Sequence, residues 1–201
     1  MKKKILIGIP VKDFINPMSR LKETLELNER IQLQKSLIQN IVTSFKNEER
    51  DIFLISNDEN VENFAHELEI KVFKTAKKDL NKEVIQFSTL FDQYVAWMIC
   101  HADLPYVNKF VANLFCTEII ENQIIITSSK DNGTPIIGGI FKFNNFRFGK
   151  NSFFEHKKLF IKNKIEYSQL FLKELSFEID NPDDYESFLQ HKPRWFRKRE
   201  I

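Results

Sequence analysis

An apolar run ends at a carboxylate in the stretch Ile99-Cys100-His101-Ala102-Asp103-Leu104-Pro105. This stretch indicates the class of fold and the place of a candidate site. Residues 95–100 predict a strand buried in a sheet, and Pro105 cannot continue a strand ladder. Open α/β sheets bind ligands just beyond the carboxyl ends of their strands, where a lone acid is a candidate Mg²⁺ ligand. Asp103 could equally cap a helix that begins near Tyr106, so this stretch alone leaves both roles open.

The composition is typical of a globular domain. A chain of 201 residues is long enough for one domain with a full core, and 42% apolar with 29% charged residues excludes a disordered protein. No apolar run approaches the roughly 20 residues that span a bilayer. The basic start and the apolar run 5–10 resemble a signal peptide, but Lys12 and Asp13 follow at once. We therefore expect a cytoplasmic protein without a membrane partner, in which Cys100 and Cys116 are buried free thiols.

The charge pattern does not indicate a nucleic-acid partner, and none is expected. The formal net charge is only +2. Basic residues gather near the end of the chain around Trp195 and Phe196, which predicts a solvated tail rather than a binding patch. The expected organisation is a single domain over residues 1–192, followed by a basic tail over residues 193–201.

Alternating apolar and amphipathic segments in the first third of the chain predict a parallel sheet. Strands are expected over residues 4–10, 52–56 and 70–73. The helices between them begin at Asn28 and after Asp58, which caps the second helix. Because right-handed crossovers join strands in this pattern, the predicted fold class is α/β. It is a single-domain, mostly parallel Rossmann-like sheet flanked by helices.

The later part of the chain is less regular, and one or two antiparallel strands are expected there. The expected elements are a helix after Asn81, a helix over 106–118, strands over 123–127 and 136–143, a helix over 153–163 capped by Ser152, and a strand over 175–179. The sequence Asn181-Pro182-Asp183-Asp184 then predicts the start of a last helix, with a cap, a proline at the first position and acids in the first turn.

Glu178 and Asp180 alternate along the expected last strand, which would place both carboxylates on one face. Adjacent carboxylates repel and need a cation between them, unless one takes up a proton. If this strand lies beside the one that ends near Asp103, three acids predict a Mg²⁺ site that handles nucleotide phosphates. Two solvated acids fit the spacing equally well. The four histidines form no site by spacing, although His101 could line a pocket.

Two further groups of residues are candidates for binding anions. Lys12 and Arg20 lie in the loop after the first strand, which wraps phosphates in α/β nucleotide binders, although no Gly-rich or Walker motif is present. Gly149 and Ser152 lead into a helix N-terminus, whose N–H groups and dipole favour a phosphate or carboxylate. Thr134 offers a hydroxyl to the same pocket. Each group alone is also compatible with a purely structural role.

The order of these motifs resembles the 2-phospho-L-lactate guanylyltransferase (CofC/FbiD) family, including its phosphoenolpyruvate guanylyltransferase-like members. The motifs are Ile9-Pro10-Val11-Lys12, Ser19-Arg20-Leu21, Ala102-Asp103-Leu104-Pro105, Asn132-Gly133-Thr134, Phe146-Arg147-Phe148-Gly149 with Ser152-Phe153, and Glu178-Ile179-Asp180-Asn181-Pro182-Asp183-Asp184. The resemblance extends over residues 5–189, and the phrase from residue 146 to 153 is its most specific part.

The resemblance implies an α/β fold of the nucleotide-diphosphosugar transferase type and a Mg²⁺-dependent guanylyltransferase. Such an enzyme moves GMP from GTP onto the phosphate of 2-phospho-L-lactate, phosphoenolpyruvate or, in some members, 3-phosphoglycerate. It releases pyrophosphate and serves the biosynthesis of the deazaflavin coenzyme F-420. The implied partners are GTP and a small phosphorylated three-carbon acid, and the oligomeric state, a homodimer included, is left open.

The resemblance also implies roles for individual residues, matched by motif. The metal-binding acids are Asp103, Glu178 and Asp180, the contacts to the phosphorylated acid are Thr134, Gly149 and Ser152, and the loop at the GTP phosphates contributes Lys12 and Arg20.

The chain departs from the usual family pattern at four places. Met18 stands where a lysine is usual, Pro135 where an asparagine is usual, and Glu178 where an aspartate is usual. The phrase Asp79-Leu80-Asn81 stands where Gly-Leu-Asn is usual. Two alternatives therefore stay open. One is another nucleotidyltransferase of the same fold, of the molybdenum-cofactor or sugar-phosphate type, although these usually carry a Gly-rich loop after the first strand. The other is a degenerate nucleotide-binding protein without catalytic activity.

Overall fold

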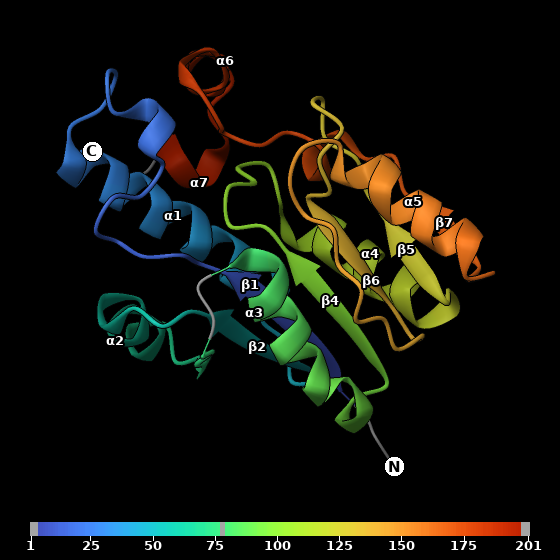
Figure 1. Ribbon diagram of the computed structural model, residues 1–201. Coiled ribbons are helices and arrows are strands. Elements are labelled where there is room, and N and C mark those ends of the chain that lie inside the picture. Colours follow the sequence, from blue (N-terminus) through green and yellow to red (C-terminus); the bar gives the residue numbers. More distant parts are fainter. Residues whose placement is uncertain (1–3, 77–78, 198–201) are drawn as a thin grey trace.

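The computed structural model describes residues 4–76 and 79–197, and its centre is a seven-stranded sheet with the order β3-β2-β1-β4-β6-β5-β7 (Figure 1). The strands are β1 (Ile5–Pro10), β2 (Arg50–Ile55), β3 (Lys71–Phe73), β4 (Ala96–Cys100), β5 (Ile124–Ile126), β6 (Ile136–Gly139) and β7 (Tyr167–Gln169). The helices are α1 (Leu27–Phe45), α2 (Glu59–Glu67), α3 (Leu80–Phe87), α4 (Lys109–Glu121), α5 (Ser152–Lys162), α6 (Pro182–Gln190) and α7 (Arg194–Arg197). Short 3₁₀ helices cover Ser19–Leu21, Ser88–Gln93 and Lys173–Leu175.

The strand directions confirm the predicted α/β class. Strand β1 pairs in parallel with β2 and β4, β2 pairs in parallel with β3, and β5 pairs in parallel with β7. Strand β6 lies between β4 and β5 and runs antiparallel to both. In this register Cys100 is opposite Ile136, so the beginning of β6 meets the end of β4.

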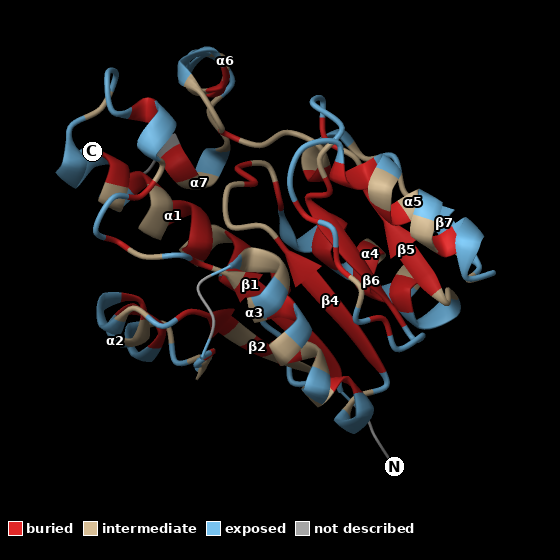
Figure 2. Cartoon of the chain, in the orientation of Figure 1, coloured by how far each residue is buried: buried red, intermediate tan, exposed pale blue. Residues whose placement is uncertain are grey.

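Both faces of the sheet are buried, as the continuous apolar runs of β1 and β4 predict. Along β4, Ala96, Met98 and Cys100 join the core cluster that α1, α2 and α4 cover, whereas Trp97 and Ile99 join the cluster beneath α3 and α5. All five residues of β4 are buried, and Figure 2 shows the central strands as the most buried part of the fold. Cys100 and Cys116 are buried free thiols, as expected.

A third core cluster lies outside the sheet and anchors the C-terminal segment on α1. Phe188 of α6 and Phe196 of α7 pack there with Leu33, Leu37 and Ile179. The expectation of a solvated tail from residue 193 is therefore wrong for its first residues, because Phe196 is only 5% exposed.

The indole of Trp195 attaches the same segment to the centre of the fold. Its Nε1–H donates a hydrogen bond of 2.9 Å to the carbonyl oxygen of Pro105. Lys198 and Arg199, which the tail prediction includes, lie outside the described residues.

The expected strand over residues 175–179 is also wrong. A 3₁₀ helix ends at Leu175, and residues 176–181 form no strand of the sheet. Ile179, which an alternating pattern would place against a sheet, packs instead in the third cluster between helices. The strand at this edge of the sheet, beside β5, is β7, whose sequence Tyr167-Ser168-Gln169 carries no apolar pattern.

The first helix after β4 starts later than expected and is capped by another residue. Helix α4 begins at Lys109, and the Asn108 side chain accepts hydrogen bonds from the N–H groups of Phe110 and Val111. Asp103 therefore caps no helix. Phe110, in the first turn of this helix, is 76% exposed.

Two other boundaries differ from the sequence prediction. Strand β6 stops at Gly139 rather than at residue 143. Asn151, in a left-handed conformation with φ of 56°, precedes α5, so Ser152 is the first helical residue and not the cap. No helix among residues 4–76 and 79–197 is long and apolar enough to cross a bilayer.

The packing of Phe196 predicts that the C-terminal segment contributes to stability. Phe196→Ala should lower the free energy of unfolding by about 3 kcal/mol, because it removes a buried ring and leaves a cavity. Arg194→Ala, at an exposed position on the same helix, should change it by less than about 0.5 kcal/mol. Chemical denaturation measures both values, and equal small losses would mean that α7 does not pack in solution.

Candidate metal and phosphate site

Two backbone hydrogen bonds assemble the candidate site at the carboxyl end of β4. The N–H of His101 donates to the carbonyl of Pro135 at 2.9 Å, which continues the β4–β6 ladder by one residue. The N–H of Ile179 donates to the carbonyl of Asp103 at 3.1 Å. The segment that carries Glu178 is thereby held alongside the strand end, although it is not part of the sheet.

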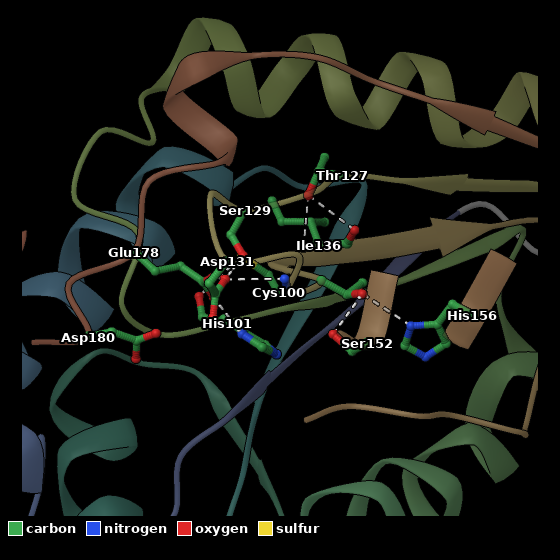
Figure 3. Close-up of polar contacts among 12 residues, drawn as sticks. Cys100, His101, Thr127, Ser129, Asp131, Ile136, Ser152, His156, Glu178 and Asp180 are labelled. Atoms are coloured by element: carbon green, nitrogen blue, oxygen red, sulfur yellow. Dashed lines mark hydrogen bonds and ion pairs between the residues drawn. The ribbon is translucent and has the colours of Figure 1, made fainter. Parts of the chain in front are cut away.

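His101, Asp103 and Glu178 form a compact cluster at this place. Each offers one ligand atom, and these atoms lie within 4.8 Å of one another. The Nδ1 atom of His101 is 2.8 Å from Oε1 of Glu178, and Figure 3 shows the two side chains directed toward each other. Asp103 and Glu178, predicted from the sequence to be neighbours, do meet, and His101 joins them.

Two buried polar atoms of the cluster lack hydrogen-bond partners among the described residues, which is the main indication that the cluster binds a ligand. Oδ1 of Asp103 and Nε2 of His101 are buried atoms that have no hydrogen-bond partner within residues 4–76 and 79–197. Burying such atoms costs free energy unless a ligand satisfies them. Carboxylate oxygens that are withdrawn from water and lack a donor suit a divalent cation. The two carboxylates therefore fit a divalent cation, the class of ion that the family resemblance implies.

The titration properties of the cluster follow from burial and from the crowding of charges. Burial and the nearby charge of Glu178 raise the pKa of Asp103 from 3.8 to about 7, although His101 opposes this. Burial alone would lower the pKa of His101. The hydrogen bond to Glu178 and the surrounding negative charge outweigh it and raise that pKa to about 9. Negative charge thus dominates the cluster, which favours a bound cation.

Asp180 lies at the rim of the cluster and outside the group of potential ligand atoms. Its Oδ1 forms an ion pair of 3.3 Å with Nη1 of Arg20. Burial and the charge of Glu178 raise the pKa of Asp180, while Arg20 lowers it. Arg20 therefore lies at the rim of the cluster, where it is paired with one of the three acids predicted to bind the metal.

Basic and acidic side chains line a pocket next to the cluster. Its lining comprises Arg20, Ser129, Lys130, Asp131, Ser176, Phe177, Glu178, Asp180, Asn181 and Asp184. Lys130 Nζ lies 3.5 Å from Oδ1 of Asp184, so the loop after β5 and helix α6 face each other across it. Lys12 is exposed in the loop after β1, where its carbonyl accepts a hydrogen bond from Ser56 Oγ.

The hydroxyls of Thr134 and Ser152 belong to a buried network rather than to the open pocket. Ser152 Oγ donates to Thr134 Oγ1 at 3.0 Å, and Thr134 Oγ1 lies 3.1 Å from Nδ1 of His156 (Figure 3). Nε2 of His156 accepts a hydrogen bond of 2.9 Å from the N–H of Arg147. Because Nε2 is an acceptor, the neutral ring carries its proton on Nδ1 and donates it to Thr134.

The N-terminus of α5 is similarly occupied by the protein itself. The N–H of Ser152 donates to the carbonyl of Gly149 at 3.1 Å, and that of Phe153 donates to the carbonyl of Asn132 at 3.0 Å. Gly149 is exposed, has a φ of 128°, and has no atom within 4 Å of where a Cβ would stand. Of the three predicted acceptor contacts, Gly149 is accessible, whereas Thr134 and Ser152 would first have to give up internal hydrogen bonds.

Asn81 fixes the loop that ends at Gly149, a role that no sequence pattern reveals. Its Nδ2 donates to the carbonyl of Phe148 at 3.0 Å, and its Oδ1 accepts from the N–H of Phe148 at 2.7 Å. The helix that presents Asn81 is itself capped by Asp79, which accepts from the N–H of Lys82. This paired contact ties the start of α3 to the loop before α5.

His101 and His156 are the other site residues that the sequence does not identify by spacing. The position of His101 two residues before Asp103 is the only local signal of its role. His156 is recognisable only from its burial, because it lies within an ordinary amphipathic helix.

Comparison with known families decides where the chain belongs. Residues 4–195 match the family described as guanylyl transferase CofC like. The chain belongs to this family.

Curated relatives and solved structures agree with that membership. The 2-phospho-L-lactate guanylyltransferase of Methanosphaera stadtmanae is 29% identical over 197 residues, which cover 94% of this chain and 85% of the relative. The phosphoenolpyruvate guanylyltransferase of Thermobaculum terrenum is 22% identical and covers 90% of this chain and 80% of its own. The predicted family is thereby confirmed, and its model and both relatives carry the name of a guanylyltransferase.

Two solved structures show the same fold. One is assigned as a nucleotide-diphospho-sugar transferase from Desulfovibrio desulfuricans G20, with a TM-score of 0.79 at 16% identity, covering 100% of this chain and 92% of that one. The 4-diphosphocytidyl-2C-methyl-D-erythritol synthase of Anaerococcus prevotii gives 0.62 at 12% identity, covering 94% and 99%. At these identities the likeness concerns the fold alone.

The buried His156 predicts a specific pH dependence of stability for this family member. Burial lowers the pKa of His156 from 6.5 to about 3. In the unfolded chain the ring takes up a proton as the pH falls below about 6.5, while the folded ring does not. Wild-type stability should therefore fall with decreasing pH across this window, by up to about 1.4 kcal/mol per pH unit from this residue.

The variant His156→Gln isolates this contribution. It is expected to be less stable than wild type at pH 7, and the difference should narrow by about 1 kcal/mol between pH 7 and pH 5.5. Urea denaturation at several pH values measures it, with the exposed His191→Gln as the control histidine. A difference that stays constant with pH would contradict a neutral, buried His156.

Proposed function

We propose that this chain transfers GMP from GTP onto the phosphate of a phosphorylated three-carbon acid and releases pyrophosphate, as a step in the biosynthesis of coenzyme F-420. The observation that carries the proposal is the pair Asp103 and Glu178 at the end of β4, with a buried carboxylate oxygen that lacks a partner. Family membership supports guanylyl transfer. The names of the relatives support 2-phospho-L-lactate and phosphoenolpyruvate as acceptors, and 3-phosphoglycerate is the third candidate.

The reaction requires no general base. A phosphate monoester has a second pKa of about 6, so the attacking oxygen is largely ionised at neutral pH. It forms a bond to the α-phosphorus of GTP, while the bond from that phosphorus to the oxygen bridging the β-phosphate breaks. The electron pair leaves with pyrophosphate, and no proton has to be removed from the nucleophile. The main barrier is the approach of two polyanions in line.

Asp103 and Glu178 would hold Mg²⁺, and Asp180 would add negative charge at the rim of the cluster. The ion would neutralise phosphate charge and polarise the α-phosphoryl group. The protein contribution is a set of carboxylates fixed before substrate arrives, because the hydrogen bond from Ile179 to Asp103 holds the two segments together. Such preorganisation lowers the cost of stabilising charge during the reaction.

Arg20 and Lys12 would bind the phosphates of GTP. The Arg20 side chain is 70% exposed, and its partner Asp180 is one of the acids that the cation would attract. Arg20 is thus in reach of an exchange in which it leaves Asp180 for a phosphate oxygen. The backbone around Gly149 is the accessible part of the proposed acceptor site, and Lys130 offers a further positive charge across the pocket.

The first test of this proposal is the variant Asp103→Asn. Pyrophosphate release from GTP, Mg²⁺ and each of the three phosphorylated acids should fall by roughly 10³-fold, because a neutral amide no longer helps to hold the cation. The thermal unfolding midpoint should stay the same or rise, since a crowded buried charge is removed. Asp183→Asn, at an exposed acid of α6, is the matched control and should keep wild-type activity. Wild-type turnover in Asp103→Asn would disprove the metal role, and no release by the wild-type chain with any acid would favour a degenerate, non-catalytic protein.

The second test concerns the GTP phosphates. Arg20→Ala should raise the KM for GTP by about tenfold or more, corresponding to about 1.4 kcal/mol of lost binding. Lys22→Ala removes an exposed positive charge two residues away and should change KM little. Steady-state kinetics with GTP as the varied substrate separates the two variants. Equal KM values would place Arg20 outside the nucleotide site.

A further inference from the structure

The cluster at the end of β4 contains a donor that Mg²⁺ does not favour. Of the three residues in the described chain that could share one ion there, two provide oxygen and His101 provides nitrogen. Mg²⁺ prefers oxygen ligands, whereas an imidazole nitrogen favours divalent transition-metal ions, and among these Mn²⁺ is the ion that carboxylate oxygens also suit. The identity of the third residue therefore bears on which cation the site selects.

We propose that Nδ1 of His101 is a ligand of the bound cation, together with Asp103 and Glu178, and that the site consequently selects Mn²⁺ over Mg²⁺. This inference rests on the metal site of the proposed function and extends it to the choice of metal.

The spacing of the donor atoms supports a shared ion. His101 Nδ1 and Glu178 Oε1 are 2.8 Å apart. Adjacent ligands of an octahedral ion, each about 2.1 Å from the metal, lie about 3 Å from each other. The three donor atoms all lie within 4.8 Å, which is compatible with one coordination sphere after small side-chain adjustments.

An ion pair between His101 and Glu178 explains the cluster less completely. A protonated His101 satisfies one oxygen of Glu178 but leaves Asp103 Oδ1 buried without a partner. A cation bound by all three residues supplies Asp103 with the positive partner that it lacks. The negative charge that surrounds the imidazole is then balanced by the ion instead of by a ring proton.

The surroundings of His101 hold the ring in the orientation that ligation needs. Its backbone N–H is fixed to Pro135, and its ring lies against that of Phe148 with the centroids 5.3 Å apart. Phe148 is held in turn by its two hydrogen bonds with Asn81. Nδ1 therefore stays directed toward the acids. Nε2 then keeps the ring proton, and it is a buried atom without an acceptor among the described residues.

The test uses the full-length protein labelled with ¹⁵N in histidine only, stripped of metal and loaded with Mn²⁺ in the presence of unlabelled GTP. Pulsed electron paramagnetic resonance then reports ¹⁵N coupling to Mn²⁺ from histidine alone, since the guanine nitrogens are ¹⁴N. We expect such coupling in the wild-type protein and its loss in His101→Asn. We also expect His101→Asn to lower the ratio of Mn²⁺ to Mg²⁺ affinity by about tenfold or more in competition titrations.

The control is His66→Asn, which changes an exposed histidine of α2 and should preserve both the coupling and the ratio. Because the wild-type spectrum is informative by itself, the test does not depend on whether His101→Asn folds. Bound Mn²⁺ without ¹⁵N coupling, no bound Mn²⁺ at all, or an unchanged affinity ratio in a folded His101→Asn would each overturn the proposal.

Pyrophosphate release measured in parallel separates this inference from the proposed function. Release with Mg²⁺ together with a spectrum free of ¹⁵N coupling would refute the ligand role of His101 and leave guanylyl transfer standing. A coupled spectrum without release from any of the three acids would support the ligand role and refute guanylyl transfer.

Discussion

The antiparallel pairing of β6 with β4 is the constraint on which the candidate site depends. Cys100 is opposite Ile136, and the bond from His101 to Pro135 carries the ladder one residue beyond the strand. Because the strands run in opposite directions, the first residues of β6 meet the last residues of β4. The turn-rich loop over residues 128–134 is thereby delivered to Asp103. If β6 ran parallel to β4, the loop that precedes it would lie at the amino end of β4, far from Asp103.

A second constraint brings Glu178 to the same place from far along the chain. The contact between His101 and Glu178 spans 77 residues of sequence. It is maintained by the hydrogen bond from Ile179 to Asp103, by the burial of Ile179 among the helices, and by the bond from Trp195 to Pro105. The C-terminal segment therefore does more than close the fold, because its packing on α1 sets the position of one potential ligand relative to another.

The sequence predicts the fold where burial leaves a distinctive pattern. Strands β1 and β4 are apolar on both faces, and Asn181 accepts the hydrogen bond from Asp184 that its position before Pro182 predicts. Residues 175–179 are predicted to be a strand because apolar and polar residues alternate there. This alternation also suits a segment that packs against helices, as Ile179 does. Strand β7 is polar and at the sheet edge, so only backbone pairing identifies it.

The site is predictable to a similar and limited extent. Asp103 is visible as an acid just beyond a buried strand, and Glu178 as an acid before a helix cap. The place of His101 in the site depends on its contact with Glu178, which is 77 residues away in the sequence and cannot be predicted from a local pattern. The burial of Thr134 and Ser152 depends on His156, whose place in the core follows from the packing of α5 and not from any local motif.

The contrast between two neighbouring polar networks indicates where the chemistry is concentrated. Thr134, Ser152 and His156 satisfy one another with internal hydrogen bonds, and the core can bury them at little cost. The cluster around Asp103 is buried with an unpaired oxygen and crowded negative charge, so it costs stability in the absence of a ligand. The network of Thr134, Ser152 and His156 shows that this fold can pair its buried polar groups internally. Packing alone therefore does not explain why the oxygen of Asp103 is left unpaired. The unpaired oxygen and the crowded negative charge are best explained as a place for a bound cation. The internally hydrogen-bonded network beside the cluster holds the surrounding backbone rigid.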